Sequence, residues 1–166
     1  MLLELILIRH GETEFNLQGR LQGGQDSPLT ERGRRESVLL GQSMNRFLDR
    51  VDQWWVSPQG RARETSRLMR EQIQFELPLE EVHEQTHEIR CGDWEGLSRA
   101  ELDPEEVRRI HSSTSIRYPG SDGESIEDVS DRCRIVLEDW KKSLPESAVS
   151  YRTVIVAHGN WVRCMG

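Results

Sequence analysis

Short apolar runs alternate along this chain with longer segments of helical periodicity, and this alternation restricts the possible fold more than any other feature. Residues 2–8 (LLELILI) and residues 153–156 (TVIV) are apolar and contain β-branched side chains, which predicts two buried strands. Residues 53–56 and 79–83 are shorter candidates for strands. Because helical segments separate these runs, the pattern favours an α/β fold with a mainly parallel sheet covered by helices, a three-layer α/β/α arrangement.

Residues that favour helix starts locate the helices between the strands. Thr30 is a suitable N-cap for a helix that runs to about Arg50, and a second helix is expected from about Arg61 to Gln74. The segment Ser125-Ile126-Glu127-Asp128 is a capping-box pattern that opens a further helix. Residues 98–123 are polar and less regular, with a short helix expected after Asp103, and we predict that they form a lid or a substrate-selecting insertion.

Length and composition limit the class of protein. A chain of 166 residues has the size of one domain, so we expect residues 1–166 to form a single domain. The net charge of −7 argues against a general nucleic-acid partner.

The longest apolar run is too short to span a bilayer, and the first residues lack a signal-peptide pattern, so we expect no membrane partner and a cytoplasmic location. Three cysteines without C-x-x-C spacing suggest neither a disulfide framework nor a zinc site.

Polar side chains follow three of the predicted strands, where an open α/β sheet binds its ligands. Arg9 and His10 follow the first strand, Arg61 comes shortly after the second, and His158 follows the last. Arginine forks match phosphate oxygens, and a neutral imidazole nitrogen can attack phosphorus, so this composition predicts a phosphoryl site. Metal binding by the two histidines is the competing interpretation. Neighbouring guanidinium groups would repel a cation, and no carboxylate stands at ligand spacing, so we expect no metal and no other cofactor.

The run 7–16 (LIRHGETEFN) closely resembles the signature of the histidine phosphatase superfamily, the phosphoglycerate mutase-like proteins. Further matching segments follow in the order of the family: residues 19–23, 26–30, 57–58, 61–62, 64–65, 88–89, 92–96, 123–125 and 156–159. Gln59-Gly60 and Cys91 depart from the usual pattern of the family, but neither departure removes a catalytic group. The resemblance covers nearly the whole chain and implies a phosphoglycerate mutase-like fold. Relatives usually continue for several elements beyond the His-Gly step, so we expect this chain to be shortened at its C-terminus.

The resemblance also implies a role for individual residues. It makes His10 the nucleophile that forms a phosphohistidine, and it makes Glu88 the proton donor. Arg9, Arg61 and His158 would line the phosphate pocket. Five further residues match positions that contact the substrate: Asn16, Gln22, Gly23, Arg63 and Gly159.

These roles predict a phosphoryl-transfer enzyme and leave three possible functions open. The sequence specifies neither the physiological substrate nor the oligomeric state, for which a homodimer is one option. A phosphoglycerate-type phosphomutase and a non-catalytic interaction module that retains the fold are the alternatives. Because the 98–123 insertion is compact, the first prediction is a phosphomonoesterase that acts through a phosphohistidine on a small phosphorylated metabolite.

Overall fold

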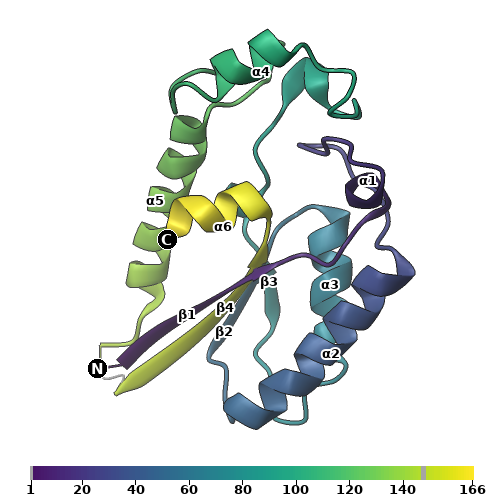
Figure 1. The fold of residues 1–166 in the computed structure, drawn as a ribbon. Helices are drawn as coiled ribbons and strands as arrows, with labels where there is room; N and C mark the ends of the chain where they lie inside the picture. The colour runs from purple at the N-terminus through teal and green to yellow at the C-terminus, as the bar shows by residue number, and fades with distance from the viewer. Residues whose placement is uncertain (1, 147–148) are drawn as a thin grey trace.

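A computed structural model describes residues 2–146 and 149–166, and in this part of the chain four strands form one sheet (Figure 1). The strands are β1 (Leu2–Arg9), β2 (Gln53–Val56), β3 (Glu80–Val82) and β4 (Ser150–Ala157). Their order is β1-β4-β2-β3, and every neighbouring pair is parallel. The predicted parallel sheet is therefore confirmed, and β2 has the predicted bounds.

Helices cover both faces of this sheet (Figure 1). The four helices concerned are α2 (Glu31–Phe47), α3 (Gly60–Arg70), α5 (Ile126–Ser143) and α6 (Gly159–Met165). Successive residues of a strand point to opposite faces, so Trp54 and Val56 of β2 pack in the core of α2 and α3. Trp55 between them packs in the core of α5 and α6. This alternation confirms the three-layer α/β/α prediction.

The predicted helix starts are confirmed, whereas two predicted helix ends are too late. The Thr30 side chain accepts a hydrogen bond from the Gly33 amide at the start of α2, and Ser125 and Asp128 form both bonds of a capping box at α5. Helix α2 ends at Phe47 rather than near Arg50.

Helix α3 ends at Arg70 rather than at Gln74, because tertiary contacts replace the helical hydrogen bonds there. The side-chain amide of Asn45 donates to the Gln72 carbonyl at 2.9 Å, and its oxygen accepts from the Gln74 amide at 2.9 Å. A partner on another helix cannot be inferred from the helical period alone.

Two further helices are short. Helix α4 (Pro104–Ile110) begins after Asp103, as predicted. Helix α1 (Glu14–Leu17) was not predicted, although Thr13 and Asn16 form a capping box at its start. Two 3₁₀ turns, η1 (Glu84–Thr86) and η2 (Gly92–Trp94), flank the segment that carries Glu88.

In the described residues, no helix is both long and apolar enough to cross a membrane. The three cysteines are free thiols, and Cys91 and Cys133 lie in the core.

Candidate active site

The parallel pairing of β1 with β4 places His10 beside His158. Arg9 is the register partner of Ala157, and the His10 amide donates to the Ala157 carbonyl at 3.0 Å. Both histidines therefore leave the sheet at the same edge, and their ring centroids lie 5.2 Å apart. This is the carboxyl edge of the strands, where the sequence predicted that the two side chains meet.

Local hydrogen bonds define the chemical state of His10. Its Nδ1 lies 2.8 Å from the Gly11 carbonyl, which can only accept, so Nδ1 carries the proton. Nε2 is then the unprotonated nitrogen, and it accepts a hydrogen bond from Arg61 Nε at 3.3 Å. Burial and the positive charge of Arg61 lower the pKa of His10 to about 4. His10 is accordingly a neutral imidazole near pH 7, and the unprotonated Nε2 accepts a hydrogen bond from Arg61.

His158 is fully buried, and it is held by Ser57, the residue that follows β2. The distance between His158 Nε2 and Ser57 Oγ is 2.7 Å. Burial, followed by the charge of Arg61, lowers the pKa of His158 well below its ordinary value. Among the described residues, His158 Nδ1 has no hydrogen-bond partner.

Arg61 is buried in the first turn of α3, and its guanidinium is fixed by the loop before α2. Nη1 donates to the Gln25 carbonyl at 2.7 Å and to Asp26 Oδ1 at 2.8 Å, while Nη2 donates to the Gly23 carbonyl at 3.0 Å. A buried charge is costly unless it is paired and hydrogen-bonded, and Asp26 provides the pairing. Burial lowers the pKa of Arg61, although the Asp26 carboxylate opposes this effect.

Gly23 is needed for the backbone that receives Arg61. Its φ is +53°, and a Cβ at this position would lie 2.8 Å from the Cys91 amide nitrogen. Its carbonyl also accepts a hydrogen bond from Gln59 Nε2 at 2.8 Å. The structure thus gives Gly23 a role in holding Arg61, and a direct contact with substrate stays a prediction.

Glu88 lies against the first turn of α6, which begins directly after His158. Its Oε2 accepts from the Asn160 amide at 3.3 Å, and its Oε1 accepts from the Ile89 amide at 2.9 Å. The Glu88 amide donates to Gln59 Oε1 at 2.8 Å. The negative charge of Glu88 also acts on Arg61, where it raises the pKa of the guanidinium against the effect of burial. Glu88 therefore belongs to the same site as the two histidines.

Arg9, His10 and Asn16 line one pocket of about 390 Å³. Arg9 packs on the backbone of Gly159, since a Cβ on that glycine would lie 3.5 Å from Arg9 Nε. Asn16 Oδ1 accepts from the Thr13 amide at 3.2 Å, so its side chain also caps α1.

Gln22 and Arg63, two of the predicted substrate contacts, are not among the residues that line this pocket. Gln22 is buried, and its Oε1 accepts from Ser27 Oγ at 3.1 Å. Arg63 is exposed on α3 and is not among the residues that line the pocket at His10. A substrate contact by either residue stays a prediction.

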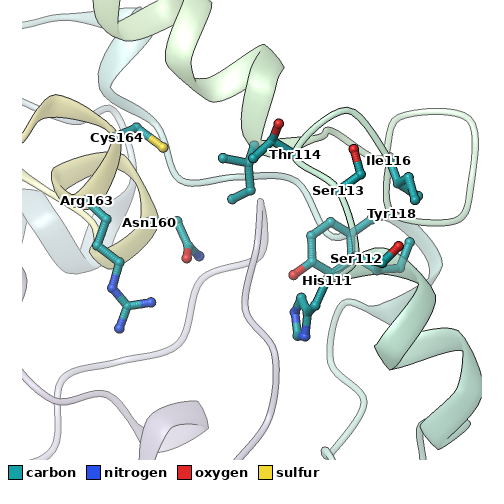
Figure 2. A pocket seen from close by; sticks show the side chains of 11 residues that line it. His111, Ser112, Ser113, Thr114, Ile116, Tyr118, Asn160, Arg163 and Cys164 are labelled. Carbon is teal, nitrogen blue, oxygen red and sulfur yellow. The ribbon is translucent and has the colours of Figure 1, made fainter.

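A second pocket, of about 500 Å³, lies between α6 and the 110–118 part of the insertion (Figure 2). Asn160, Arg163 and Cys164 of α6 lie on one side of it, and residues from His111 to Tyr118 lie on the other. Because the Asn160 amide bonds Glu88, this pocket adjoins the carboxylate of the site. The predicted lid thus borders the site, and its function as a lid stays a prediction.

Sequence reasoning singled out no role for Asp26 or for Ser57. Ser57 follows a predicted strand, which is a signal for a position at the carboxyl edge of the sheet. Asp26 lies in a segment that matches the family, but the match does not indicate its partner Arg61, which lies 35 residues further along the chain.

A parallel sheet covered by helices, with two neutral histidines and a buried arginine beyond its carboxyl edge, defines an α/β protein with a candidate active site at that edge. The chain belongs to the histidine phosphatase superfamily, because the model of branch 1 of this superfamily matches residues 5–166. The family resemblance seen in the sequence is therefore confirmed.

Named relatives in this family include mutases and phosphatases. The chain is 32% identical to 2,3-bisphosphoglycerate-dependent phosphoglycerate mutase 2 of Gloeobacter violaceus, covering 97% of this chain and 73% of the relative. It is also 32% identical to phosphoserine phosphatase 1 of Hydrogenobacter thermophilus, covering 99% and 74%. A solved structure of mycobacterial glucosyl-3-phosphoglycerate phosphatase in complex with VO3 matches with a TM-score of 0.83 and 27% identity, covering 97% and 77%. Phosphoryl transfer is thus supported as the class of reaction.

Proposed function

We propose that this protein is a phosphomonoesterase that hydrolyses a small phosphorylated metabolite through a phosphohistidine on His10. The observation that carries the proposal is the state of His10, which has its proton on Nδ1, a lowered pKa, and an unprotonated Nε2 hydrogen-bonded to Arg61. A nitrogen nucleophile must be unprotonated to attack phosphorus. Arg61 can bind the phosphate oxygens that approach it.

In the first step, His10 Nε2 attacks phosphorus in line with the leaving oxygen. The N–P bond forms while the P–O bond breaks, and Glu88, which must enter this step as the protonated carboxyl, gives its proton to the departing alcohol and becomes a carboxylate. Arg61 and His158 stabilise the charge on the equatorial oxygens. The imidazole keeps its Nδ1 proton, and the Gly11 carbonyl stabilises the positive charge that develops on the ring.

In the second step, a water molecule attacks the phosphohistidine. Glu88 takes a proton from this water, the N–P bond breaks, and inorganic phosphate leaves with His10 restored. Phosphatase and mutase share the first step and differ in the group that accepts the phosphoryl. A mutase would keep water out and transfer the group to a second hydroxyl. The second pocket is bordered by exposed residues such as His111 and Arg163, which favours access of water and hence hydrolysis.

The test is turnover of a panel of phosphomonoesters in the presence of EDTA, with His10→Ala as the control. In the described residues, no three His, Cys, Asp or Glu side chains are grouped to hold a metal ion. We expect release of inorganic phosphate that EDTA leaves unchanged and that orthovanadate, a mimic of five-coordinate phosphorus, inhibits competitively. The control should lose several powers of ten in rate.

Each alternative function gives a different result in this assay. Isomerisation of a phosphoglycerate without release of phosphate would identify a mutase. An absence of turnover on every ester, including p-nitrophenyl phosphate, would identify a binding module. Loss of activity in EDTA with recovery on adding a divalent ion would show that the expectation of a metal-independent reaction is wrong.

A further inference from the structure

A buried ion pair outside the site fixes the backbone that carries Glu88. Arg132 in the second turn of α5 and Glu124 just before that helix have side chains that are only 10% and 8% exposed. Arg132 Nε and Nη2 donate to Glu124 Oε1 and Oε2, each at 3.1 Å, in a two-point geometry. The segment 85–90, which carries Glu88, lies directly against this pair.

The pair binds the backbone of this segment on both sides of Glu88. Arg132 Nη1 donates to the carbonyls of Gln85 and His87, each at 2.9 Å. On the other side, the Arg90 amide donates to Glu124 Oε2 at 2.9 Å, and the Glu124 amide donates to the Arg90 carbonyl at 2.9 Å. The segment therefore has fixed points before and after the carboxylate.

The same segment is also joined to the helix that follows His158. The indole of Trp161, which is fully buried in α6, donates to the Gln85 carbonyl at 2.9 Å. Glu88 Oε2 accepts from the Asn160 amide of the same helix. The buried pair thus sets where the carboxylate lies relative to the histidine edge of the sheet.

We infer that Arg132 and Glu124 are positioning residues that hold Glu88 at the distance from the leaving oxygen that proton transfer requires. This inference rests on the proposed function, in which Glu88 is the proton donor. Neither side chain needs to touch the substrate, because the effect passes through the backbone of the segment 85–90. A displacement of a reacting group by about 1 Å can lower a rate about 100-fold, so a small shift of this segment has a large effect.

The variant Arg132→Lys tests the inference, because lysine keeps the charge but cannot make the two-point bond and reach both carbonyls. We expect a fall of about 10- to 100-fold in turnover of an alkyl phosphate whose leaving group needs a proton. Turnover of p-nitrophenyl phosphate should fall less than about threefold, because nitrophenolate leaves almost without acid assistance. A loss of general stability would lower both rates together. An equal loss on both substrates would therefore overturn the inference.

Matched variants separate this effect from failure of the proposed function. Glu88→Gln gives the reference loss on alkyl phosphate, and adding Arg132→Lys to it should cause no further selective loss. If Glu88→Gln itself lowers the turnover of both substrates equally, the donor role and the inference that rests on it are both wrong. Arg152→Lys is the control for the substitution, because Arg152 also makes several bonds but lies near the amino end of β4. The Arg152→Lys variant should leave the ratio of alkyl phosphate turnover to p-nitrophenyl phosphate turnover unchanged.

If Arg132→Lys does not fold, the double variant Arg132→Met with Glu124→Gln removes the pair without leaving a buried charge unpaired. It should show the same selective loss on alkyl phosphate. A double variant that folds and keeps the wild-type ratio of the two rates would contradict the inference.

Discussion

His10 shows how neighbouring atoms turn an ordinary side chain into a nucleophile. The Gly11 carbonyl fixes the tautomer, and burial together with the Arg61 guanidinium keeps the ring neutral. A histidine in water has a pKa of about 6.5 and would be partly protonated at neutral pH. The environment of His10 therefore removes the competition between proton and phosphorus for Nε2.

This account predicts the titration of His10. Since the lowered pKa favours the neutral form in the folded state, His10 should stay neutral from pH 7 down to about 5 and gain a proton near pH 4. The measurement is the pH dependence of the imidazole NMR signals of the free protein, with His10→Asn used to assign the resonance. In the unfolded chain the same ring should titrate with a pKa of about 6.5. A midpoint near this unfolded value in the folded protein would contradict the account.

The candidate site could be predicted in part from its residues. His10, Arg61 and His158 follow apolar strands, and parallel strands deliver such residues to one edge. The bonds from Arg61 to Asp26 and from His158 to Ser57 could not be predicted, because each joins segments that are distant in the sequence. The period of a strand or helix specifies a face, whereas the partner on that face depends on tertiary packing.

Helices α2 and α3 pack closely because of a glycine in α2. A Cβ at Gly41 would lie 2.3 Å from the Met69 carbonyl oxygen of α3, nearer than any side chain tolerates. The helix α3 in turn carries Arg61 in its first turn. The spacing of the two helices is thus connected to the position of the site.

The variant Gly41→Ala should destabilise the fold, although alanine is the better helix former by about 1 kcal/mol. The added methyl must push the helices apart, which costs about 1–3 kcal/mol in a well-packed core. The measurement is the free energy of unfolding in urea, with Arg35→Ala on the exposed face of α2 as the control. An increase in the free energy of unfolding for Gly41→Ala would contradict the claim that α2 and α3 are too close to accept a methyl group at this position.

At the scale of the whole molecule, one strand pair determines the position of the site. Residues from Leu2 to Arg9 pair in parallel with residues from Ser150 to Ala157, so β1 at the edge of the sheet lies beside β4 although the two strands are far apart in the sequence (Figure 1). The class of fold was predictable because β1, β2 and β4 each have an apolar run of their own. The order of the strands was not, since β1 pairs with β4 although β2 and β3 come between them in the sequence.

The central claim is that a phosphoryl group is bound covalently to His10 during turnover. The most direct measurement is rapid quenching of the protein with p-nitrophenyl phosphate into alkaline denaturant, followed by mass analysis of the peptide that contains His10. We expect one added phosphoryl group on His10, stable in alkali and lost in acid, in the wild type and in the His83→Gln control. The group should be absent in His10→Ala. A phosphoenzyme of the same amount in His10→Ala, or hydrolysis by the wild type with no phosphorylated His10 at any quench time, would contradict the account.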